Sequence, residues 1–195
     1  HNRSRDWGSD LLGEAMKRQM MRNFFVAMMV SHGTPMILGG DEWMRTQHGN
    51  NNAYSTSADN EWNWFRWGEW QSSYATHRHR MHDFVRQLTG MRSRYGYALS
   101  PDSYGGGMPY SWKTTANEEM SSTDWNGRTV AIHYYADGDY SEEDELFILV
   151  NMEREDVDFT LPSGRDWARV VDTQSWYDLP EAGETGGWFS ENPEA

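Results

Sequence analysis

The sequence predicts an α/β segment followed by a small antiparallel β-sandwich, and three observations lead to this fold class. A helical pattern precedes a short apolar run that is bounded by Pro and Gly. A polar loop follows that run, as it does at the carboxyl end of a strand in α/β proteins. After Tyr97, strand-like runs separated by turn residues replace the helical patterns. We therefore expect two domains, residues 1–99 and 100–195.

The first helix is expected to begin after Ser9 and Asp10, which can cap its amino terminus. Gly33 and Pro35 are expected to end it. Its apolar residues follow the spacing of a buried helical face, at Met21, Phe24, Phe25, Met28 and Met29. We interpret these methionines as core packing and not as a cofactor-binding stripe.

The apolar run "TPMILGG", residues 34–40, predicts a strand buried on both faces, as in a parallel sheet. In such sheets, ligands bind beyond the carboxyl ends of the strands. Asp41 and Glu42 stand at that end. Because neighbours on a strand point to opposite faces, these two carboxylates are not expected to face one ligand together.

Residues 77–95 predict a second helix, and its apolar face comprises Met81, Phe84, Val85, Leu88 and Met91. His77, His79 and His82 raise the alternative of a metal site at its start. A zinc site needs three or four ligands, two of these histidines point away from each other, and no fourth ligand is apparent. We therefore expect a solvated helix face, no metal and no cofactor.

The second half of the sequence predicts the strands of the sandwich. The four strand-like runs are residues 129–136, 145–152, 157–162 and 167–173. The acidic segment "DGDYSEEDE", residues 137–145, resembles a calcium loop only in its acidity, since it lacks the required glycine and the spaced final glutamate. We expect an acidic hairpin loop there.

Charge and composition exclude several classes of partner. The net charge is −13, and it divides into +3 for residues 1–100 and −16 for residues 101–195. Such acidity repels phosphate backbones, so no nucleic-acid partner is expected.

No apolar run is long enough for a membrane span, so no membrane partner is expected. The absence of cysteine fits a reducing compartment, and we expect a cytoplasmic protein. Only two lysines accompany the many acidic residues, which leaves salt adaptation open beside an ordinary acidic surface.

Residues 40–70 gather the groups that bind sugars, because carboxylates, amides and arginine pair with hydroxyls and flat aromatic rings stack on the C–H faces of the sugar. Five of the eleven tryptophans fall between Trp43 and Trp70. The alternative is that the amides close turns and the tryptophans pack. The candidate substrate-binding residues are Asp41, Glu42, Arg45, Asn50, Asn51, Asn52, Tyr54, Asp59 and Asn60.

The order of these residues carries a family resemblance. "GTPMILGGDEWMRTQHGNNNAY", residues 33–54, followed by "DNE" at 59–61, resembles the last barrel strand and following loop of the glycogen-debranching and isoamylase branch of the α-amylase superfamily. Residues 16–33 and 84–99 look like the flanking helices of that barrel. The resemblance implies the last part of a (β/α)8 barrel, with its seventh helix, eighth strand and eighth helix, followed by a C-terminal antiparallel β-sandwich. The segment 55–58 and the bulky pair Trp43-Met44 depart from the family pattern and leave the fine specificity open.

The resemblance also implies a function, the hydrolysis of α-1,6 branch linkages in glycogen or amylopectin. In that superfamily the catalytic carboxylates lie on earlier barrel strands, which would place them upstream of His1. We therefore expect no catalytic residue in this chain and no activity from it alone, and its partners would be an α-glucan and the missing N-terminal part of the barrel. The alternative is a non-catalytic α-glucan-binding or regulatory subunit that retains this half of the fold.

Overall fold

The computed structural model describes residues 11–47, 59–60, 63–71, 76–101, 106–137, 140–141 and 144–174 of the 195-residue chain. Its contacts divide the chain into two compact units, one made of residues 1–91 and 169–195 and the other of residues 92–168. The segment after residue 168 thus groups with the first helices by contact.

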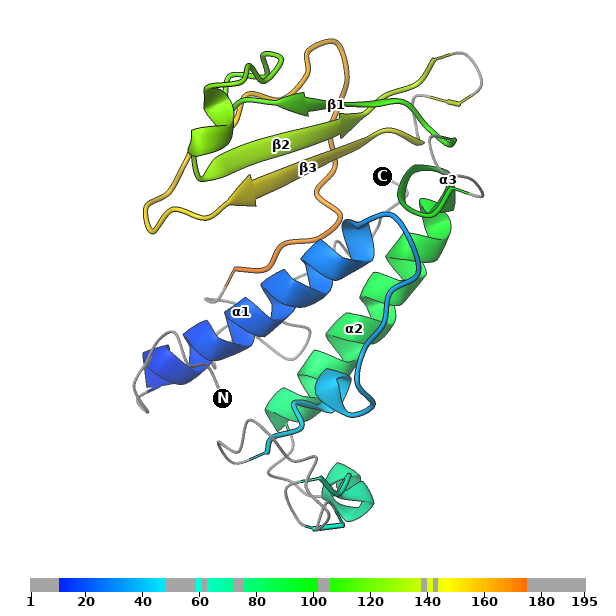
Figure 1. The fold of residues 1–195 in the computed structure, drawn as a ribbon, viewed down its shortest axis with the longest axis vertical. Helices are drawn as coiled ribbons and strands as arrows, with labels where there is room; N and C mark the ends of the chain where they lie inside the picture. Colours follow the sequence, from blue (N-terminus) through cyan, green and yellow to red (C-terminus); the bar gives the residue numbers. More distant parts are fainter. Residues whose placement is uncertain are drawn as a thin grey trace. The chain divides into compact units, whose positions relative to one another are not determined.

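Two long helices build the first unit, α1 at Leu11–Val30 and α2 at Thr76–Arg94 (Figure 1). Both helices were expected from the apolar spacing, and the cap expected at Ser9 and Asp10 lies outside the described residues. The buried core between them consists of Phe25, Met29, Met81, Phe84, Val85 and Leu88. Phe24 is a correction, because its side chain is 69% exposed. Neighbouring positions on a helix are rotated by about 100°, so Phe24 and Phe25 cannot both face the core fully.

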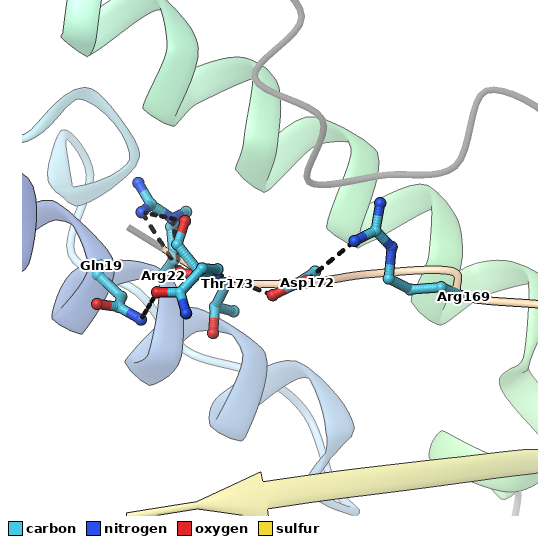
Figure 2. Close-up of polar contacts among 6 residues, drawn as sticks. Gln19, Arg22, Arg169, Asp172 and Thr173 are labelled. Carbon is cyan, nitrogen blue, oxygen red and sulfur yellow. Dashed lines mark hydrogen bonds and ion pairs between the residues drawn. The ribbon is translucent and has the colours of Figure 1, made fainter. Parts of the chain in front are cut away.

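The segment after residue 168 lies against α1. Arg22 is almost fully buried and donates hydrogen bonds to the carbonyl oxygens of Thr173 and Gln174, each at 3.4 Å (Figure 2). Gln19 Nε2 donates to Gln174 Oε1 at 3.2 Å, and Asp172 Oδ1 accepts from the Gln174 amide at 2.9 Å. Val171 packs on the core of the two helices. These contacts explain why residues far apart in the sequence belong to one unit.

Residues 34–40 do not form the predicted buried strand in this structure. Residues 34–38 carry no regular secondary structure, and residues 39–40 form a turn. Met36 is 88% exposed, and Leu38 is also exposed. A strand of a parallel sheet is held by hydrogen bonds to the strands on its flanks. The sheet in the described part of the chain is formed by later segments, between residues 110 and 151, and does not include residues 34–40. The apolar character of these side chains predicted burial, but no described residues bury Met36 and Leu38.

The second unit contains a three-stranded antiparallel sheet with strand order β1-β2-β3 (Figure 1). Its strands are β1 at Tyr110–Lys113, β2 at Thr129–Tyr134 and β3 at Leu146–Asn151. In the register, Trp112 faces Ile132 and Ile132 faces Ile148. The short helix α3, Gly96–Leu99, buries Ala98 and Leu99 in the same unit. A small antiparallel β-domain was expected here, and the sheet agrees with it.

The sheet also corrects the predicted strands. β2 and β3 fall inside the predicted runs 129–136 and 145–152, whereas β1 was missed because it is short and polar at alternate positions. The runs 157–162 and 167–173 are not strands, although Val171 forms an isolated bridge. A strand needs a ladder of partners, and the hydrogen bond from the Thr160 amide to the Thr115 carbonyl, at 2.8 Å, is a single contact. The second layer of the sandwich stays a prediction.

A buried carboxylate ties the end of this sheet to the following chain. The Glu145 side chain is 1% exposed, and its Oε2 lies 3.0 Å from Arg165 Nε and 3.3 Å from His133 Nε2. Its Oε1 accepts a hydrogen bond from the Ala136 amide at 2.9 Å. The imidazole of His133 packs edge to face on Phe147 and lies near the ring of Trp167. Because a buried charge is costly unless it is paired, this group of contacts is a main polar support of the second unit.

Candidate functional site

The site predicted after residue 40 is built on a tight turn. Gly40 has a φ of +102°, and its carbonyl oxygen accepts hydrogen bonds from the amides of Trp43 and Arg45, both at 2.9 Å. The turn continues into the 3₁₀ helix η1, Asp41–Trp43, and Met44 leaves it with a φ of +57°. A glycine is required at position 40 because L residues rarely adopt such a φ. This turn sets the directions of the side chains that follow it.

The two carboxylates of this turn have different environments. Glu42 Oε2 accepts a hydrogen bond from the Gly40 amide at 2.8 Å, so that carboxylate is folded back on its own turn. Burial raises the pKa of Asp41, and the positive charge of Arg45 opposes that shift. The two residues lie on a 3₁₀ turn and not on a strand, which corrects the reason given for their divergence. With three residues per turn, neighbouring side chains still point about 120° apart.

A second predicted segment is brought against this turn. A Cβ placed on Gly40 would lie 2.8 Å from Phe65 Cδ2, so the two residues are in direct contact. Gln47 Nε2 donates to Asn63 Oδ1 at 3.4 Å. The structure thus joins the turn that holds Asp41, Glu42 and Arg45 to the segment that begins at residue 59. Phe65 and Asn63 were not predicted as site residues, although the paired glycines at 39–40 were a signal of close approach.

The segment from residue 59 presents aromatic rings. Asp59 and Asn60 precede a turn in which the amides of Asn63 and Trp64 both donate to the Asn60 carbonyl. Trp64 Nε1 donates to Asp59 Oδ1 at 2.6 Å, which fixes the indole. Trp64 is exposed, and Trp67, which begins the 3₁₀ helix η2 at Trp67–Gln71, is 80% exposed. The ring of Trp67 packs edge to face on Phe65. Exposed indoles held in this way are suited to stacking on sugar rings.

A cluster of rings anchors this segment to α2. Trp43 is buried, and its ring centroid lies 4.5 Å from that of Trp70 and 4.8 Å from that of His79. The ring of Trp70 also lies 5.0 Å from that of His82. His79 and His82 are therefore half-buried aromatic partners, whereas the sequence indicated a solvated helix face. The bulk of Trp43, which departs from the family pattern, fills this cluster.

Several predicted site residues cannot be placed. Asn50, Asn51, Asn52 and Tyr54 lie outside the described residues. In the ranges that are described, no group of three or more His, Cys, Asp or Glu side chains is arranged to hold a metal ion. No helix in those ranges combines the length and apolar character that crossing a membrane requires.

Comparison with known proteins finds one matching family model and several similar curated proteins. Residues 109–189 match the family model described as "Isoamylase, C-terminal". Over these residues the chain is similar to the isoamylase C-terminal family. The resemblance to the isoamylase and glycogen-debranching branch is thereby confirmed, because the similarity to isoamylase also extends over most of the chain.

Three relatives illustrate the extent of that similarity. The chain is 32% identical to isoamylase of Pseudomonas amyloderamosa over 83% of its own length and 20% of that protein. It is 32% identical to isoamylase of a Flavobacterium species over 86% of its length and 22% of the relative. It is 27% identical to the glycogen operon protein GlgX homolog of Haemophilus influenzae over 90% of its length and 25% of the relative. The chain thus spans about a fifth to a quarter of the curated relatives that it matches.

Proposed function

We propose that this chain is the C-terminal part of a glycoside hydrolase that cleaves α-1,6 branch linkages in α-glucans of the glycogen or amylopectin type. The observation that carries the proposal is the similarity to isoamylases and GlgX homologues over most of the chain. The structure supports it as well, because the turn at Gly40 contacts the segment that carries the exposed tryptophans. Carboxylates near indole rings can bind the hydroxyls and the C–H faces of a sugar. The cysteine-free sequence agrees with a cytoplasmic enzyme.

The catalytic carboxylates of this enzyme would lie upstream of His1. Hydrolysis with retention needs a nucleophile and an acid about 5–5.5 Å apart, facing one glycosidic bond. Asp41 and Glu42 do not offer such a pair, because Glu42 is bonded to its own turn and the two side chains diverge. We assign Asp41 and Arg45 to substrate binding and not to bond cleavage.

The upstream part of the barrel would be the partner of residues 34–38. Met36, Ile37 and Leu38 are apolar and exposed, and they precede the turn that holds the candidate site. Strands added on both flanks would bury these side chains and convert the segment into a barrel strand. The loop after residue 40 would then lie at the carboxyl face of the barrel, where ligands bind.

Asn51→Ala and Asn52→Ala, made in the complete protein that carries this chain, test the substrate-binding role of the asparagine run. We expect turnover of amylopectin to fall roughly tenfold, because each change removes hydrogen bonds to substrate hydroxyls. Release of linear chains is measured by reducing ends and iodine staining, and the melting temperature is measured alongside. Unchanged turnover with a lowered melting temperature would make the asparagines turn scaffolding and contradict their assignment.

A further inference from the structure

We propose that the second unit carries a separate carbohydrate-binding site, formed by Trp112 and Trp125 beside a polar pocket. This surface would hold a chain of an α-glucan independently of the candidate site at residues 40–70. The identity of the sugar as an α-glucan rests on the proposed function, whereas the site itself rests on the geometry of residues 112–129.

Two tryptophans form an exposed aromatic pair. Trp112 lies on β1 and is 37% exposed, and Trp125 lies in the 3₁₀ helix η4, Asp124–Asn126, and is 54% exposed. Their ring centroids are 5.2 Å apart and the ring planes meet at 68°. Large exposed aromatics that contact each other are unusual on a surface that faces only water. The edge of one indole meets the face of the other, so the pair presents an angled aromatic surface. Such a surface suits a curved chain of sugar rings, as in α-linked glucans, better than a flat one.

A pocket of about 310 Å³ lies in the same segment of the unit. Its size is at the lower end of the range for small-ligand sites. Its lining is rich in hydroxyls and comprises Thr114, Thr115, Met120, Thr123, Asp124, Gly127 and Thr129. Asp124, which lines the pocket, directly precedes Trp125 in the chain, and Thr114, which also lines it, lies two residues after Trp112. Threonine hydroxyls and a carboxylate beside indole rings are the groups that recognise a polyol.

The loop that carries Trp125 is held by its own hydrogen bonds. Asp124 Oδ2 accepts from the Ser121 amide at 2.7 Å and from Ser121 Oγ at 2.6 Å. The Gly127 amide donates to the Asp124 carbonyl at 2.9 Å, and the Met120 amide donates to the Trp112 carbonyl at 3.0 Å. Because the loop is already ordered, a ligand would not need to order it on binding.

The charge of this surface favours a neutral ligand. The bonds from Ser121 hold the pKa of Asp124 below its usual range, so this carboxylate is ionised near neutral pH. The half of the sequence that contains the site carries a net charge of −16. An anionic ligand would be repelled there, whereas sugar hydroxyls can donate to the carboxylate. Among the described residues, Asp124 Oδ2 accepts both hydrogen bonds from Ser121, and Asp124 also lines the pocket.

Native gel electrophoresis of the complete protein, in gels with and without amylopectin, tests the site. We compare wild type with Trp112→Ala and Trp125→Ala, and Tyr135→Ala serves as control. Tyr135 is also 37% exposed but follows β2, where alternation along the strand places it on the other face of the sheet from Trp112. We expect each tryptophan variant to bind amylopectin about fivefold more weakly than wild type, and Tyr135→Ala to be retarded like wild type. Circular dichroism establishes that each variant is folded, and Trp125→Ala, in an exposed turn, remains informative if Trp112→Ala misfolds.

Equal retardation of wild type and of the folded tryptophan variants would overturn the second site, as would a wild type that amylopectin does not retard. An equal loss in Tyr135→Ala would also overturn it, because the effect would not be local. The proposed function is judged separately, by cleavage of branch linkages by the wild-type protein. The wild-type protein could fail to cleave branch linkages and still be retarded by amylopectin in a way that depends on Trp112 and Trp125. That result would support the site and contradict the proposed function.

Discussion

Gly40→Ala is expected to unfold the turn of the candidate site and to reduce turnover in the complete protein by at least about tenfold. The φ of Gly40 is +102°, which costs an L residue about 1–3 kcal/mol. A Cβ at this position would also lie 2.8 Å from Phe65 Cδ2 and 3.0 Å from Arg45 Cδ. Overpacking of this kind adds about 1–3 kcal/mol. The change would separate the turn at residue 40 from the segment that carries Trp64 and Trp67.

Two neighbouring glycines provide matched controls. Gly33 has a φ of +96° with no atom within 4 Å of an added Cβ, so Gly33→Ala tests the backbone strain alone. Gly39 has neither a left-handed φ nor a close neighbour, so Gly39→Ala should be almost neutral. Melting temperature and amylopectin turnover should therefore fall most for Gly40→Ala, less for Gly33→Ala and least for Gly39→Ala. If Gly40→Ala behaved as Gly39→Ala does, the contact between Gly40 and Phe65 would not exist.

Glu145→Ala is expected to destabilise the second unit by about 2–3 kcal/mol, because it removes a buried carboxylate that pairs with a partly buried arginine and accepts a backbone hydrogen bond. The carboxylate is 1% exposed and faces Arg165 and His133, and it also accepts the Ala136 amide. Its removal takes away the countercharge of Arg165 and the acceptor of a backbone amide. Glu145→Gln keeps an oxygen acceptor and should lose less. Urea unfolding followed by circular dichroism measures the change.

Another Glu–Arg pair of the same unit is the control for this prediction. Glu153 lies 3.6 Å from Arg128, with 42% of its side chain exposed. Exposed ion pairs contribute about 0–1 kcal/mol, so Glu153→Ala should change stability little. Similar unfolding midpoints for Glu145→Ala and Glu153→Ala would show that the buried pair does not support the unit.

The helices could be predicted from sequence because their apolar residues repeat with the period of a helix over many turns. α1 and α2 gave that signal at Phe25, Met29, Phe84 and Leu88, which do form the core. β2 and β3 were predicted as apolar runs bounded by turn residues. β1 was not predicted, because it has only four residues and two of them are polar. The run at 34–40 predicted a strand because its apolar composition suits burial. A strand also needs neighbouring strands, and the described sheet does not supply them to this run.

The candidate site was predicted in composition but not in geometry. The polar loop that carries Asp41 and Arg45 could be predicted from the paired glycines before it, since glycine pairs have a strong local signature. The contact of Gly40 with Phe65 and the stacking of Trp43 on His79 join segments far apart in the sequence. No local pattern encodes such a pairing, because it depends on how α2 and the preceding loop pack.

The central claim is that this chain contributes binding and support, while the cleaving carboxylates lie upstream. The most direct measurement is the release of linear chains from amylopectin, by reducing ends and iodine staining, by residues 1–195 alone and by the complete protein. We expect activity for the complete protein and none above a buffer blank for residues 1–195. Activity of residues 1–195 that Asp41→Asn or Glu42→Gln abolishes would contradict this claim, as would a complete, folded protein that leaves the branches intact.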